Sequence, residues 1–143
     1  MAKCKFKWGG WECPLEALPG EEYCYWHREE EGKEPDDAKL RELKKNKIFG
    51  VFLRKANLGG KDLQKADLGG ANLQGAALEY ANLEGANLIG VIADSGTHLD
   101  WANLTCANLY HSYLDETKTL RNAKFESEKE INEIVADFLK KRE

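Results

Sequence analysis

The chain has 143 residues, of which 42% are hydrophobic and 32% charged, so it is long enough to bury the core of one small domain. Its formal net charge of −4 excludes the strongly basic surface typical of nucleic-acid-binding proteins, and no apolar run reaches the roughly 20 residues that a membrane span needs. The N-terminus has charge but no apolar stretch behind it, so we expect no secretory signal and a cytoplasmic protein.

Residues 1–34 contain a group of metal-ligand residue types. Cys4, Cys13, Cys24 and His27 follow the pattern C-x8-C-x10-C-x2-H. Two residues between the last cysteine and the histidine let both side chains point at one ion from a tight turn. Three thiolates and one imidazole make a closed tetrahedral shell for Zn²⁺, which suits a structural site and not a catalytic one. The pattern predicts a zinc-binding knuckle over residues 1–34, a length that rarely folds without such a staple.

Two other interpretations of these cysteines stay open. Two of them could form a disulfide, which the lack of any sign of export disfavours. They could also be three reduced and unrelated thiols. The fourth cysteine, Cys106, lies far along the chain, and we expect it to be a thiol outside the metal site.

Residues 35–50 are predicted to form a linker and an N-terminal capping helix. The acidic, polar stretch from Glu29 to Asp37 has the composition of a linker. The run Pro35-Asp36-Asp37 is typical of a helix start, and Leu40 and Leu43 give the helix an apolar face through about Asn46. We expect the apolar residues that follow to plug the first coil of the next segment; they are Ile48, Phe49, Val51 and Phe52.

Residues 51–127 contain a repeat of five residues. Leucine recurs at every fifth position from Leu53 to Leu88, mostly with alanine two residues earlier and Asn or Asp between them. An extra residue at Gly96 shifts the frame, and a second shift lies near Thr117. In all, about fifteen units run from residue 51 to residue 127.

A five-residue period excludes both a long helix and a flat strand. On a helix the leucines would spiral around the surface, and on a strand they would alternate between the two faces. Only a chain that turns a corner once per unit points every leucine at one axis. Glycines such as Gly60 and Gly70 stand at the ends of units, where a corner needs positive φ. The repeat therefore predicts a solenoid.

The repeat units resemble the pentapeptide-repeat family, whose consensus is Ala-(Asp/Asn)-Leu-X-X. The matching units are AlaAsnLeuGlyGly (56–60), AlaAspLeuGlyGly (66–70), AlaAsnLeuGlnGly (71–75), AlaAsnLeuGluGly (81–85), AlaAsnLeuIleGly (86–90) and AlaAsnLeuThrCys (102–106). The resemblance implies a mainly β fold, a right-handed quadrilateral β-helix with four units per coil. At about 4.8 Å between stacked strands, it would be roughly 18 Å tall.

Counting the shift at Gly96 places certain residues in vertical columns. Tyr80 is expected to stack under Trp101, Ile92 under Tyr113, and Leu104 under Phe125. This puts several aromatic side chains on the outside of the upper coils: Tyr80, Trp101, Tyr110 and Tyr113. They form either a surface for a partner or a packing surface for a terminal element.

Residues 128–143 are predicted to form an amphipathic capping helix. Ser127 and Glu130 have the spacing of a capping box, and the apolar residues beyond them lie on one helix face. That face is formed by Ile131, Ile134, Val135, Phe138 and Leu139. It either covers the last coil or joins two copies of the chain, so a monomer and a homodimer both remain open.

The sequence indicates a protein that is not an enzyme. It contains no phosphate-binding loop and no HExxH motif, and its repeat carboxylates are explained by the pattern. We expect a scaffold or protein-binding module with a structural zinc site and an unidentified protein partner.

Two alternatives involve nucleic acid or its enzymes. The family resemblance brings to mind a DNA-mimicking inhibitor of a type II topoisomerase, although the net charge of residues 51–127 is only −2. The knuckle could instead bind nucleic acid or protein through Lys3, Lys5 and Lys7 with Phe6 and Trp8. Four glutamates in the same segment oppose nucleic acid as a partner: Glu12, Glu16, Glu21 and Glu22.

Overall fold

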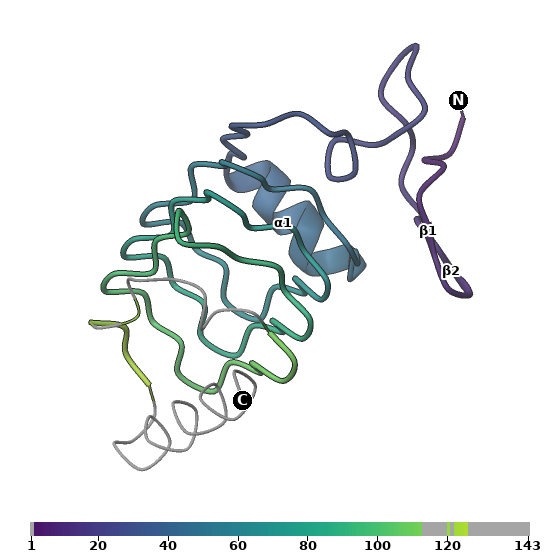
Figure 1. Ribbon diagram of the computed structural model, residues 1–143. Coiled ribbons are helices and arrows are strands. Elements are labelled where there is room, and N and C mark those ends of the chain that lie inside the picture. The colour runs from purple at the N-terminus through teal and green to yellow at the C-terminus, as the bar shows by residue number, and fades with distance from the viewer. Residues whose placement is uncertain (1, 113–119, 121, 126–143) are drawn as a thin grey trace.

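The computed structural model describes residues 2–112, 120 and 122–125. The predicted C-terminal helix over residues 128–143 and the predicted stacking of Ile92 under Tyr113 lie outside these residues. The described chain forms a stack of coils, with a helix and a small hairpin segment at its N-terminal end (Figure 1).

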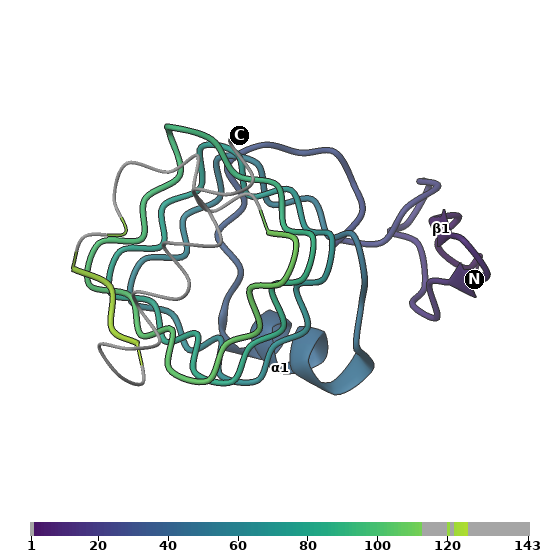
Figure 2. The same cartoon turned by 60° about the horizontal axis from the view of Figure 1, so that its bottom comes forward.

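Parallel backbone pairs join each coil to the next. Phe52 pairs with Asn72 and Asn72 with Ile92, a separation of 20 residues, whereas Ala77 pairs with His98, 21 residues further on. A 20-residue coil contains four five-residue units, and the longer separation confirms the shift at Gly96. Seen closer to the coil axis, successive coils lie over one another with the same outline (Figure 2). This confirms a mainly β solenoid, and its right-handed sense stays a prediction.

Leucine and alanine fill the interior of the coils. Every repeat leucine from Leu53 to Leu104 is at most 1% exposed, and the paired alanines from Ala56 to Ala86 are fully buried. The corners lie where the repeat predicted them, because Gly60, Gly70 and other unit-end residues have positive φ. The chain turns after every five residues, so its backbone pairs stay isolated and form no long strand.

The Asn and Asp side chains of the repeat bind the backbone of their own corner. Asn72 Oδ1 accepts a hydrogen bond from the Gln74 N–H at 3.0 Å, and Asn82 does the same for Glu84. Asn87 Nδ2 also donates to Asp67 Oδ1 on the coil below, at 3.1 Å. These contacts explain why the repeat places an amide or carboxylate beside each leucine.

Helix α1 (Asp37–Asn46) lies against the N-terminal end of the coil stack (Figure 1). Asp36 caps it by accepting a hydrogen bond from the Lys39 N–H at 2.8 Å, and Leu40 and Leu43 are buried in the common core. Ile48 and Val51 are also fully buried. The helix lies where the sequence predicted it, and of the four residues expected to plug the first coil, Ile48 and Val51 are buried whereas Phe49 and Phe52 are only partly buried.

The N-terminal segment contains one antiparallel pair of short strands. These are β1 (Lys7–Trp8) and β2 (Trp11–Glu12), with Trp8 opposite Trp11. Gly9 has a φ of 58°, which suits the tight turn between them.

Among the described residues, no helix is long and apolar enough to cross a membrane.

A leucine of the interior tests the role of the repeat in stability. Leu78 is fully buried, whereas Glu84 is exposed on the outside of the same coil. We expect Leu78→Ala to lower the free energy of unfolding by about 2–5 kcal/mol, because a cavity replaces its side chain. Glu84→Ala should change it by less than about 0.5 kcal/mol. Chemical denaturation followed by circular dichroism measures both, and equal effects would contradict the packing described here.

Candidate metal centre

The backbone of the N-terminal segment brings the predicted ligand residues together from three places. Backbone hydrogen bonds join the segments that contain Cys4 and Cys13. The Cys4 N–H donates to Leu15 O, and the Cys13 N–H donates to Phe6 O. Cys24 and His27 lie in one tight turn, in which the His27 N–H donates to Cys24 O at 3.2 Å. The two-residue spacing therefore places Cys24 and His27 in the same turn.

The four ligand atoms form a compact and buried cluster. All of them lie within 4.8 Å of one another. His27 Nδ1 is 3.3 Å from Cys24 Sγ and 3.5 Å from Cys4 Sγ, and Cys13 Sγ is 3.9 Å from Cys24 Sγ. A tetrahedron with metal–sulfur bonds of about 2.3 Å has sulfur–sulfur edges of about 3.8 Å. The cluster thus has the size and ligand set of a site for one metal ion.

A hydrogen bond of His27 indicates which of its ring nitrogens carries the proton and which is left for the sulfurs. His27 Nε2 lies 2.7 Å from Phe49 O, and a carbonyl oxygen can only accept, so Nε2 carries the proton. The lone pair of Nδ1 is then free to point at a metal between the cysteines. The Phe6 ring stacks on the imidazole at 3.8 Å and holds its plane. Ligand histidines in metal sites are oriented by such outer contacts.

The thiols have unequal acidity. A hydrogen bond from Cys13, with a smaller effect of His27, lowers the pKa of Cys24 to about 4. The same hydrogen bond raises the pKa of Cys13, and burial raises that of Cys4. Three thiolates this close repel one another, so a divalent cation is needed before all three can ionise. In the structure all three are free cysteines.

The segment that carries the cluster is bonded to the first coil. Trp26 O accepts a hydrogen bond from the Phe52 N–H at 2.7 Å, and Lys33 O accepts one from the Asn57 N–H at 2.9 Å. Trp26 is fully buried. Lys33 is also buried, its ammonium donates to the carbonyls of Arg28 and Phe52, and burial lowers its pKa to about 8. The stretch predicted as a linker therefore contains a residue packed against the coil.

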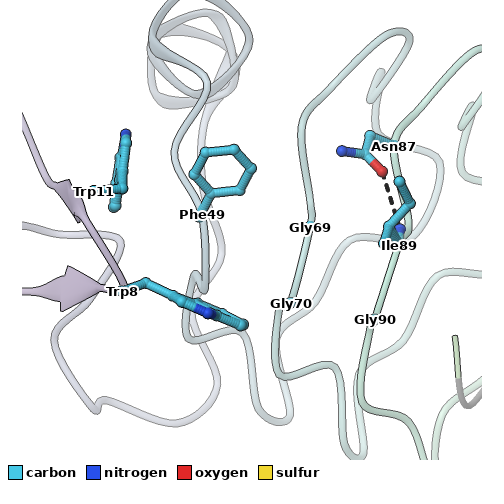
Figure 3. Close-up of a pocket in the computed structure, with 8 residues that line it drawn as sticks. All are labelled: Trp8, Trp11, Phe49, Gly69, Gly70, Asn87, Ile89 and Gly90. Carbon is cyan, nitrogen blue, oxygen red and sulfur yellow. Dashed lines mark hydrogen bonds between the residues drawn. The ribbon is translucent and has the colours of Figure 1, made fainter. Parts of the chain in front are cut away.

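A second contact joins the hairpin to the last corner of the first coil. The Trp8 indole lies against the backbone of Gly70, where an added Cβ would overlap the ring. Figure 3 shows this ring below Phe49, reaching from the hairpin toward Gly70. These residues line a pocket of about 370 Å³. The sequence pattern carried no sign of this contact, since a glycine at a corner is already explained by its positive φ.

The other residues singled out from the sequence lie on the coils. Tyr80 and Trp101 stack as predicted, with ring centroids 6.2 Å apart and planes 6° from parallel. Tyr110 is exposed beside His111, and Cys106 is exposed at a corner outside the cluster of four. The Leu104 N–H donates to Lys124 O, which confirms the predicted register with Phe125. Tyr113 lies outside the described residues.

The family model of pentapeptide repeats matches residues 56–92 and 95–118, in eight copies. This confirms the resemblance found in the sequence. No curated protein matches the chain.

The solved structures that match it include pentapeptide repeat proteins. A pentapeptide repeat protein (Rfr23) from the cyanobacterium Cyanothece 51142 is 30% identical, with 55% of this chain and 63% of that chain covered and a TM-score of 0.31. HetL, from the cyanobacterium Nostoc sp. strain PCC 7120 and described as involved in heterocyst differentiation regulation, is 29% identical, with 53% and 45% covered and a TM-score of 0.38. The chain thus spans less than two thirds of either protein.

Two glycines with the same backbone conformation test the docking of Trp8. Gly60 and Gly70 have φ values of 67° and 66°, but nothing lies within 4 Å of a Cβ added at Gly60. Alanine at either position costs about 1 kcal/mol in conformational strain. We expect Gly70→Ala to lower the free energy of unfolding by about 1 kcal/mol more than Gly60→Ala does, because its methyl group displaces the indole. Thermal denaturation measures the difference, and identical melting temperatures of the two variants would show that Trp8 does not dock there.

Proposed function

We propose that this pentapeptide-repeat protein is a non-enzymatic binding module in which one structural Zn²⁺ closes the N-terminal end of the coil. Cys4, Cys13, Cys24 and His27 would hold the ion, and the faces of the coil would receive a protein partner.

The buried, closed cluster of four ligands carries this proposal. Thiolate and imidazole ligands together favour zinc among common cellular ions. Four protein ligands leave no position for water or substrate, so the ion would support structure and not chemistry. His27 Nε2 donates to Phe49 O at the entry to the first coil, so the same side chain would connect the ion to the solenoid.

The surface of the coil supports a binding role. Tyr80, Trp101 and Tyr110 are 66%, 56% and 65% exposed, although such side chains are usually buried. Rigid repeat walls that carry exposed aromatic rings suit recognition of another protein.

The charges of the knuckle favour a protein partner over nucleic acid. Lys5 lies 3.2 Å from Glu22, and Lys7 lies 3.4 Å from Glu12. These carboxylates offset the basic residues that would otherwise contact phosphate. Inhibition of a topoisomerase rests on the family resemblance alone.

Metal analysis tests the zinc site. We expect purified protein to contain one zinc per chain, and Cys24→Ser with His27→Ala to contain almost none. Removal of the ion by a chelator should lower the melting temperature by about 10 °C or more, because binding energy becomes folding energy. Cys106→Ser is the matched control and should keep its zinc. Zinc-free protein with an unchanged melting temperature would rule the site out.

Capture from an extract of the source cells tests the binding role. We expect immobilised protein to retain a partner that survives washing in about 0.15 M salt, because an apolar aromatic contact is little screened. The same bait with Tyr80, Trp101 and Tyr110 replaced by serine should retain less of it. Mass spectrometry of the eluates measures this, and identical eluates from both baits would contradict binding through the aromatic residues.

A further inference from the structure

We propose that Tyr80 and Trp101, together with Glu79, Asp100 and Glu84, form a docking surface for an arginine-rich segment of a partner protein. This surface is called the acidic aromatic face below. The inference rests on the proposed binding function and names the chemistry of the partner.

The two aromatic residues occupy corner positions that favour glycine. Tyr80 and Trp101 both have a φ of 62°, and the corner directly below them in the same column is Gly60. A bulky residue at positive φ costs about 1 kcal/mol or more, whereas glycine adopts it freely. Folding of the coil does not require aromatic rings here. A strained residue of this kind is a reason to look for function.

The rings are stacked and open to solvent. Their planes are nearly parallel, 6° apart, and more than half of each side chain is exposed. The Tyr80 N–H donates to Asp100 O at 2.9 Å, so the two corners are held directly one above the other. The stacked pair presents the outer faces of its two rings as a platform on which a planar group can stack.

Carboxylates flank this platform. Glu79 directly precedes Tyr80, Asp100 directly precedes Trp101, and Glu84 is exposed on the adjoining side of the coil. In the described part of the chain, none of the three carboxylates takes part in an ion pair. The nearest basic residues of the neighbouring corners, Lys61 and Lys65, lie one coil below Tyr80 and Glu84.

Arginine is the group that fits both features. Its planar guanidinium stacks on aromatic faces and bonds carboxylates with two parallel N–H groups, which a lysine ammonium cannot do. A nucleic acid would be repelled by the carboxylates, and an uncharged ligand would leave them unused. We therefore assign the acidic aromatic face to arginine side chains in an extended segment, where several can be presented in a row.

Calorimetric titration with a synthetic peptide of alternating arginine and serine tests the assignment. We expect binding to weaken about five-fold or more in Tyr80→Gly with Trp101→Gly, the size of an exposed cation–π contact. Glycine suits these corners, so this variant should melt no lower than the unmodified protein. Glu79→Gln with Asp100→Asn should also weaken binding and reduce its dependence on salt. A peptide with lysine in place of arginine should bind more weakly.

Two control variants separate the face from general charge attraction. Ile92→Ala removes an exposed apolar side chain at a different position, and Glu34→Gln removes an exposed carboxylate from the N-terminal segment. Both should bind the arginine peptide as the unmodified protein does. The inference is overturned by equal binding to the glycine variant, by equal loss in the controls, or by no binding at about 1 mM peptide. Zinc content is unaffected by these outcomes, so it separates this inference from the proposed metal site.

Discussion

Every other feature of this molecule depends on the inward direction of one leucine in each five residues. In most units the leucine is buried, and a small alanine packs beside it. Together these side chains fill the interior of the coil. The chain must then turn a corner after each unit, and Asn or Asp satisfies the backbone N–H at that corner. Each coil rests on the next through parallel hydrogen bonds such as Leu58 N–H to Ala77 O. All outward side chains are consequently left free of any role in the core.

A stack of coils has an end that exposes unpaired backbone groups and the apolar axis. At the N-terminal end of this chain, Trp26 O and Lys33 O accept hydrogen bonds from the first coil, and α1 adds Leu40 and Leu43 to the core. The ligand cluster lies in the same segment as Trp26. Because a segment of this size buries little apolar surface, an ion that holds four side chains in place would keep the covering segment in register with the coil.

Local rules account for what could be predicted from the sequence. The period of five, the N-cap of α1 at Asp36 and the Cys24–His27 spacing each depend on residues close together in the chain, and each is seen in the structure. The contacts of Trp8 with Gly70 and of Lys33 with Phe52 join residues far apart, with no repeat to place them. Composition alone therefore suggested a linker where the structure shows the buried Lys33. Its buried ammonium is satisfied by two carbonyls, a pattern that only the folded chain displays.

Regularity also makes the exceptions informative. In a repeat where nearly every residue is explained by packing or by a corner, a residue that breaks the rule at a cost has some other reason to be there. Lys55, Lys65, Cys106 and His111 also have positive φ, and of these Lys55 forms an ion pair with Glu31, which lies in the segment bonded to the first coil. Tyr80 and Trp101 differ from them in that their large rings stack on each other while more than half of each side chain is exposed. Their strain stabilises nothing inside the coil, so its explanation lies in what approaches the coil from outside.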